Sequence, residues 1–308
     1  MRLFDFHCDT PFALEKDREP LTDNRLHISL KKLEAYDSYG QLMAIFTQKS
    51  LPEEVAFGRF FVIRDDFYAK MTEKTVICHT YADYEKAIGE GRYPFFLAVE
   101  GGGLLCDKIE RVTTLYEHDV RFLTLVWRDA DCIGGAFNTD IGLTDFGREV
   151  VKKCFELGII VDISHASDPM AEEVLAMAEK EGKTVIATHS NSRAVFEHPR
   201  NLPDAFAKRI ANLGGTVGIS MAPQHLADEG CADIDAICDH MMHYLEIGLS
   251  DSLTFGCDLD GVDVLPRGIE SVADLGRIVD GLRRRGVSEE QIEKICYKNA
   301  ERFLKANF

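Results

Sequence analysis

Residues 158–190 read GIIVDISHASDPMAEEVLAMAEKEGKTVIATHS, two short apolar runs separated by one segment of helical character. The runs at 159–165 and 184–189 are rich in β-branched residues, which favours strands. The segment 168–182 between them carries apolar residues at three-to-four spacing, begins with Asp-Pro and stops at Gly, as helices do. Both runs are almost continuously apolar, which indicates burial on both faces and therefore a parallel sheet.

The same alternation of strand and helix continues through the whole chain. Further strands are expected at residues 3–9, 41–47, 94–100, 121–127, 216–221 and 253–258, and further helices at 52–71, 144–158, 203–214 and 233–248. Eight β/α units in about this length predict the α/β class and a (β/α)8 barrel, whose usual size is about 250 residues. A doubly wound open sheet is the alternative, because periodicity alone does not show that the sheet closes.

Composition narrows the class of protein further. The 308 residues are 45% hydrophobic and 28% charged, typical of a soluble globular protein, and we expect one domain over 1–308 with closing helices in 268–308. The net charge of −17 argues against nucleic acid or an anionic membrane as partner. No secretory signal or membrane-length apolar run is present, and nine scattered cysteines suit free thiols, so a cytoplasmic location is expected.

Polar residues that bind metals stand at the ends of five predicted strands. Taken singly, such a histidine is usually structural and such an aspartate often caps a helix. In a β/α barrel, however, all carboxyl strand ends meet at the face that carries the active site. The set consists of His7, Asp9, Glu100, His165, His189 and Asp258.

The residue types in this set favour a zinc site. Residues i and i+2 of a strand share a face, so His7 and Asp9 can both enter the barrel mouth while Cys8 points away. Three imidazoles with carboxylates suit zinc or a similar divalent ion. Five ligands exceed one tetrahedral site, which argues for two ions with a bridging carboxylate.

Several motifs together resemble the membrane (renal) dipeptidase family of the amidohydrolase group. They are HCD at 7–9, EGG at 100–102, DISHAS at 162–167, HSNSR at 189–193, HPRNLPD at 198–204, CDLDG at 257–261 and NAERFL at 299–304. The resemblance covers nearly the whole chain in order. It implies zinc-dependent hydrolysis of a dipeptide to free amino acids, including dipeptides with a D-residue on the C-terminal side, and it is consistent with a homodimer.

The resemblance also implies a role for each site residue. Asp258 would take a proton from a metal-bridging hydroxide and return it to the leaving amine. Arg200 would bind the substrate's terminal carboxylate, for which a guanidinium fork is suited. Asp260 is the rival for the base, but the family match selects Asp258. The implied ligands are His7 and Asp9 for one zinc, His165 and His189 for the other, and Glu100 as the bridge.

One position departs from the family pattern. Mammalian members have a substrate-contacting histidine in a T-L-T-H context, whereas this chain reads TLVW with its sole tryptophan, Trp127. Loss of such a donor leaves oxyanion stabilisation and substrate preference open. Trp127 could form a wall for the substrate or simply pack. Two other functions also stay open: a two-metal hydrolase of lactones, cyclic amides or phosphoesters, and a non-catalytic ligand-binding relative.

Overall fold

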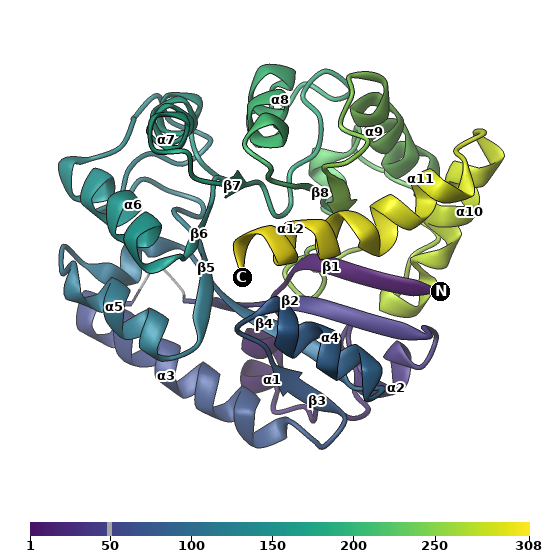
Figure 1. Ribbon diagram of the computed structural model, residues 1–308, viewed down its shortest axis with the longest axis horizontal. Helices are drawn as coiled ribbons and strands as arrows, with labels where there is room; N and C mark the ends of the chain where they lie inside the picture. Colours follow the sequence, from purple (N-terminus) through teal and green to yellow (C-terminus); the bar gives the residue numbers. More distant parts are fainter. Residues whose placement is uncertain (48–50) are drawn as a thin grey trace.

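The computed structural model describes residues 1–47 and 51–308, and its centre is a barrel of parallel strands (Figure 1). Hydrogen bonds connect the strands in the order β7-β6-β5-β4-β2-β1-β9-β8. This architecture confirms the predicted (β/α)8 barrel. The strands are β1 (Arg2–Cys8), β2 (Ser38–Phe46), β4 (Tyr93–Glu100), β5 (Val120–Thr124), β6 (Ile160–Asp162), β7 (Val185–Ile186), β8 (Val217–Ile219) and β9 (Leu253–Phe255).

The gap between β7 and β8 is bridged just beyond the end of β7. Ala187 pairs with Val217, and its amide donates to the carbonyl of Thr216 at 3.0 Å. Two glycines make this approach feasible, because a Cβ on Gly218 or Gly256 would lie within about 2 Å of the Thr188 carbonyl oxygen. The sheet therefore returns on itself, which excludes the open alternative.

Helices surround the barrel, and a short extra strand, β3 (Thr75–Ile77), pairs with the start of β4. Side chains and glycines set the helix ends: Ser167 caps α7 by accepting from the Met170 amide, and Gly182 ends that helix with a φ of 62°. The helices are α1 (Thr10–Asp17), α2 (Leu30–Leu33), α3 (Glu53–Lys70), α4 (Tyr81–Gly89), α5 (Glu110–Glu117), α6 (Asp145–Leu157), α7 (Asp168–Glu181), α8 (Asp204–Asn212), α9 (Ile234–Glu246), α10 (Gly276–Arg284), α11 (Glu289–Glu293) and α12 (Asn299–Asn307).

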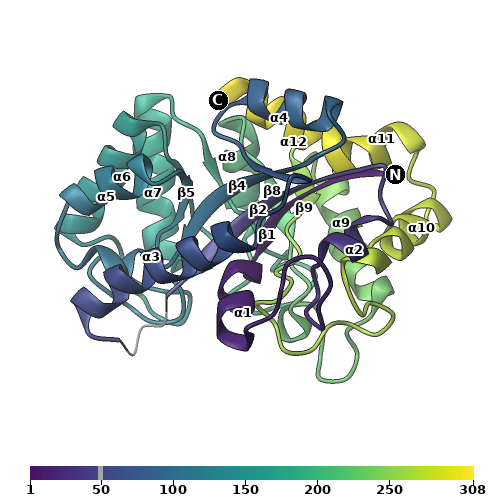
Figure 2. The same ribbon diagram turned by 90° about the horizontal axis from the view of Figure 1, so that it is seen from below.

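The amino end of the barrel is filled by apolar side chains and covered by α12. Phe303 of α12 contacts the rings of Phe6 and Phe122 at centroid distances of 5.6 and 6.1 Å. Figure 2 shows α12 and α4 on one side of the strands and α1 on the opposite side. A ligand can therefore reach the barrel interior only from the side of α1, where the strands end.

The strands end earlier than the sequence predicts. β6 ends at Asp162, β7 at Ile186 and β9 at Phe255, so His165, His189 and Asp258 lie in the loops that follow them. His165 and Asp258 have φ values of 69° and 60°, in the left-handed region that ends a strand. These three residues lie at the predicted end of the barrel. The conformation of the loops, rather than of the strands, sets the direction of their side chains. Within the described residues, no helix combines the length and hydropathy needed to cross a membrane.

Candidate metal centre

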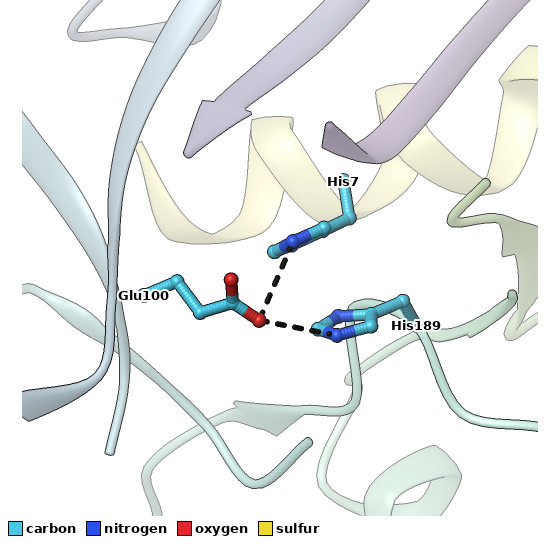
Figure 3. Close-up of side chains that lie close together, drawn as sticks. All are labelled: His7, Glu100 and His189. Atoms are coloured by element: carbon cyan, nitrogen blue, oxygen red, sulfur yellow. Dashed lines mark ion pairs between the residues drawn. The ribbon is translucent and has the colours of Figure 1, made fainter. Parts of the chain in front are cut away.

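One carboxylate oxygen faces three imidazoles at the carboxyl end of the barrel, and Figure 3 shows two of these contacts, those of Glu100 with His7 and His189. Glu100 is the last residue of β4 and is buried. Its Oε1 lies 3.6 Å from His7 Nε2, 3.4 Å from His189 Nε2 and 3.0 Å from His165 Nε2. Because each ring presents a nitrogen to the same oxygen, these side chains can share cations placed between them.

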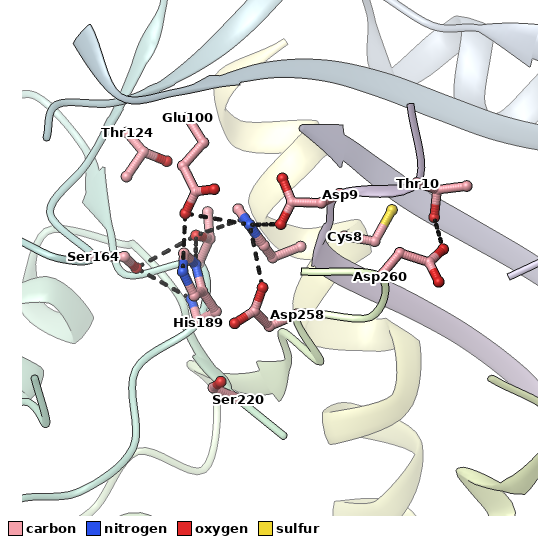
Figure 4. Close-up of polar contacts among 12 residues, drawn as sticks. Cys8, Asp9, Thr10, Glu100, Thr124, Ser164, His189, Ser220, Asp258 and Asp260 are labelled. Carbon is pink, nitrogen blue, oxygen red and sulfur yellow. Dashed lines mark hydrogen bonds and ion pairs between the residues drawn. The ribbon is translucent and has the colours of Figure 1, made fainter. Parts of the chain in front are cut away.

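Two further carboxylates approach the same centre from the neighbouring strands. His7 Nε2 lies 3.6 Å from Asp9 Oδ2 and 3.8 Å from Asp258 Oδ1. Asp9 stands at the N-cap position of α1, yet its side chain makes no capping hydrogen bond and remains directed at the site. Figure 4 shows Asp9, Asp258 and Glu100 converging while Cys8 points away from them.

A bulge at the end of β1 turns His7 inward. Leu3 belongs to the layer between sheet and helices, and Phe4 and Phe6 belong to the barrel interior, so simple alternation would place His7 outside. The pairing of β1 with β2 shifts between Asp5 and Cys8, where an extra residue enters β1. Bulges re-aim side chains in this way. The interior therefore receives both Phe6 and His7.

The donor set fits a divalent metal. His7 Nε2 and Asp9 Oδ1 are buried and have no hydrogen-bond partner, although buried polar atoms are normally paired. A Cβ on Gly261 would lie 2.2 Å from both Asp258 Oδ1 and Asp9 Oδ2, so only glycine leaves room for these two carboxylates. Sequence reasoning treated Gly261 only as part of a motif and missed this role. Nitrogen and oxygen donors in this mixture suit zinc and similar ions.

The carboxylates of the site differ in their proton affinity. Burial raises the pKa of Glu100, but the charge of His7 and the close contacts with the three imidazoles outweigh it and hold that pKa well below its usual value. Burial and the negative charges of Asp9 and Glu100 raise the pKa of Asp258 well above its usual range. Burial and Glu100 raise the pKa of Asp9 to about 6. This excess of buried negative charge favours a bound cation.

Arg200 lies directly behind the imidazoles. Its guanidinium donates from Nε to His165 Nδ1 at 3.2 Å, from Nη1 to Ser190 Oγ at 3.1 Å and from Nη2 to the His189 carbonyl at 2.9 Å. These bonds use three of the five N–H groups of an arginine. The buried side chain lies beside the predicted metal ligands and lines a cavity of about 10 Å³ with His165, not the cavity that contains Asp258.

Trp127 lies three residues beyond the end of β5 and forms a wall between two cavities. Its ring meets Phe46 edge to face at 4.5 Å between centroids. A cavity of about 140 Å³ on one side is lined by Asp9, Glu100 and Asp258. The cavity of about 260 Å³ on the other side is lined by Trp127 together with Thr47, Gly101 and Cys132.

Asp260 is turned away from the centre. Its Oδ2 accepts from Thr10 Oγ1 at 2.7 Å, and its Oδ1 accepts from the His27 amide at 2.5 Å. Both oxygens therefore fix the loop after β9 against α1 and the 24–27 segment. Asp260 lines the same cavity as Asp258, but of the two it is Asp258 whose carboxylate faces His7.

Comparisons with known proteins agree over the full length. The family model described as membrane dipeptidase (peptidase family M19) matches residues 1–307. The solved dipeptidase AC, a metallo peptidase of family M19, is similar with TM-score 0.91 and 24% identity, covering 100% of this chain and 98% of that one. A metallo peptidase from Rhodobacter sphaeroides, liganded with a phosphinate mimic of L-Ala-D-Ala, is similar with a TM-score of 0.91 and 22% identity. The match covers 100% of this chain and 99% of that one. An amidohydrolase from Pseudomonas aeruginosa has a TM-score of 0.77 and 21% identity, over 96% of this chain and 98% of that one.

Proposed function

The chain belongs to the membrane dipeptidase family, peptidase family M19, and from this premise we propose that it hydrolyses dipeptides to free amino acids with two zinc ions. The observation that carries the proposal is the convergence of three imidazoles on the Glu100 oxygen, with the carboxylates of Asp9 and Asp258 beside His7. We propose His7 and Asp9 as ligands of one ion, His165 and His189 as ligands of the other, and Glu100 as the bridge.

The proposed hydrolysis needs an activated water molecule and a group that transfers its proton. Bound divalent ions supply polarisation of the scissile carbonyl and a water molecule of lowered pKa. Asp258 accepts the proton of the attacking water and delivers it to the leaving amine, as general base and then general acid. Its carboxylate oxygen, 3.8 Å from His7 Nε2, supports this assignment.

Arg200 and Trp127 are proposed to hold the substrate. The two N–H groups of Arg200 for which the described residues provide no hydrogen-bond acceptor would bind the terminal carboxylate of the dipeptide. Trp127 would form the wall against which a side chain of the dipeptide packs, because it lines the cavity that contains Asp258. Acceptance of a D-residue at the C-terminal position is supported by the L-Ala-D-Ala mimic bound to the Rhodobacter sphaeroides relative.

The test combines a metal count with a substrate panel. Purified protein loaded with zinc is expected to hold close to two ions per chain by elemental analysis. Ninhydrin or chromatographic assay should show release of free amino acids from L-L and L-D dipeptides. Two bound metals with no turnover of any dipeptide would overturn the proposed substrate class, and turnover of a lactone or phosphoester alone would replace it.

We also infer a cytoplasmic location and keep the homodimer as a prediction. All nine cysteines are free thiols, and seven of them are buried, which suits a reducing compartment. Fractionation of the native host cells tests the location. Sedimentation of the purified protein tests the dimer.

A further inference from the structure

A buried carboxylate and a hydroxyl lie directly beneath the metal centre. Asp162 ends β6 and is fully buried, and Thr188 follows β7 and is also buried. Asp162 Oδ1 accepts the amides of Ser164 at 2.9 Å and Thr188 at 3.0 Å. Asp162 Oδ2 accepts the hydroxyls of Thr124 and Thr188, each at 2.6 Å. All four acceptor positions of this carboxylate are therefore used.

The hydroxyl of Thr188 connects this carboxylate to a histidine of the site. Thr188 Oγ1 lies 2.7 Å from His189 Nδ1. Because the hydroxyl hydrogen is given to Asp162, the oxygen presents only a lone pair to the ring. His189 Nδ1 must then carry the ring proton, which leaves Nε2 with a free lone pair. Nε2 is the atom that faces Glu100.

The same hydroxyl also faces a second imidazole. Thr188 Oγ1 lies 3.5 Å from His7 Nδ1, a longer contact than the one to His189. The His7 and His189 rings stack with centroids 3.7 Å apart. By contrast, His165 Nδ1 accepts from Arg200, which puts the proton of that neutral ring on Nε2. His165 Nε2 lies 2.8 Å from His189 Nε2, so it can donate to the lone pair there. The network therefore acts on the two rings that come from β1 and from the loop after β7.

We propose that Asp162 and Thr188 are positioning residues that hold His189, and more weakly His7, in the tautomer whose Nε2 can bind a metal ion. This inference rests on the metal centre of the proposed function. Carboxylates and hydroxyls that orient metal-bound histidines contribute about 10- to 100-fold in metal affinity in other proteins. A network that fixes the orientation of the ring lowers the cost of arranging it when an ion binds.

The chain provides a matched set of variants. Thr188→Val removes the hydroxyl that reaches His189, and Thr188→Ser restores it. Thr124→Val removes the same kind of hydroxyl from the same Asp162 oxygen but touches no imidazole in the described contacts. In Asp162→Asn the amide group would donate to Thr188, which would turn its hydrogen toward His189 and move the ring proton to Nε2.

The measurement is zinc affinity by competition with a chelator. Thr188→Val and Asp162→Asn are each expected to weaken zinc binding by about 10- to 100-fold, and Thr188→Ser and Thr124→Val by less than about threefold. Equal affinity of Thr188→Val and the wild type would overturn the inference, and so would an equal loss in Thr124→Val. Absence of zinc binding by the wild type would instead overturn the proposed metal centre.

A second measurement reads the tautomer in the wild-type protein, and a variant serves only to assign the signal. In the metal-free wild-type protein, nitrogen NMR of labelled imidazoles reports which ring nitrogen carries the proton. His189, assigned by its loss in His189→Gln, should show the proton on Nδ1. A proton on Nε2 would overturn the inference.

Discussion

Two aspartates separated by one residue in CDLDG have opposite surroundings. Asp258 and Asp260 both have positive φ values, 60° and 64°, so their backbones are alike. The Asp258 carboxylate faces His7, whereas that of Asp260 is held by Thr10 and the His27 amide. Spacing in the sequence could not separate them, because the difference lies in which partners the fold supplies.

This contrast gives a paired prediction at the residue scale. Asp258→Asn should lower kcat by about 10²- to 10⁴-fold because it removes the proton acceptor. Asp260→Asn should lower kcat by less than about tenfold and instead cost stability, since it weakens two buried hydrogen bonds. Steady-state kinetics and thermal unfolding of both variants check this. A larger kcat loss in Asp260→Asn would reverse the assignment.

Gly261 makes a second prediction at the same scale. A Cβ there would collide with Asp9 Oδ2 and Asp258 Oδ1, so Gly261→Ala should displace both carboxylates. We expect fewer than two zinc ions per chain and kcat/KM lower by about 100-fold or more. Gly58→Ala is the control, because nothing lies within 4 Å of a Cβ at that helical position. A full metal count in Gly261→Ala would contradict the steric argument.

At the scale of elements, Asp119 joins three segments around the base of α3. It accepts from Arg64 Nη2 and Tyr68 OH of α3, each at 2.7 Å, and lies 2.8 Å from His79 Nε2 before α4. Burial raises its pKa, but these three partners outweigh burial and hold the pKa below its usual value. The turn between α5 and β5 is thereby tied to α3.

The depressed pKa of Asp119 predicts how stability depends on pH. The stabilisation is fully present above the unfolded value of about 3.9 and is lost as pH falls through the lower folded value. Asp119→Asn, which tolerates the φ of 75°, should therefore cost about 1 kcal/mol near pH 7 after solvent screening, and much less near pH 3. Denaturant unfolding at both pH values measures this. A difference that is equal at both would exclude a charge effect.

Prediction from sequence succeeded for strands and helices whose own residue pattern is distinctive. The eight barrel strands follow from apolar runs such as 159–165, but the ends of β6, β7 and β9 do not, because they depend on where pairing with the neighbouring strand stops. The short strand β3 was missed, since three residues carry too little periodicity. The inward turn of His7 depends on a bulge that only pairing with β2 reveals.

At the scale of the whole molecule, the site concentrates negative charge inside a protein of net charge −17. Zinc bound only by the native state stabilises it by about 4 kcal/mol at a thousandfold excess over Kd. Removal of metal by a chelator should therefore lower Tm by about 5–10 °C, and added zinc should restore it. Calorimetry with and without chelator checks this. An unchanged Tm would argue against a metal held by both β1 and the loop after β7.

The barrel architecture explains why most of the candidate site could be predicted from the sequence. Parallel closure brings His7, Glu100 and His189 together although they are far apart in the chain, so the rule about strand ends sufficed. The supporting Asp162 and Thr188 were not found, because a buried carboxylate between two apolar residues is typical of structural and of functional roles. Their meaning depends on hydrogen-bond direction, which only the three-dimensional contacts provide.

The position of Trp127 makes its intrinsic fluorescence a probe of the candidate site. As the sole indole of the chain, it gives an emission spectrum with a single source, and that source borders the cavity lined by Asp9, Glu100 and Asp258. Cobalt in place of zinc should quench this fluorescence by energy transfer over the short separation. A dipeptide entering the cavity should shift the emission to the blue as it displaces water from the ring. Titration of either ligand would then report site occupancy without any label.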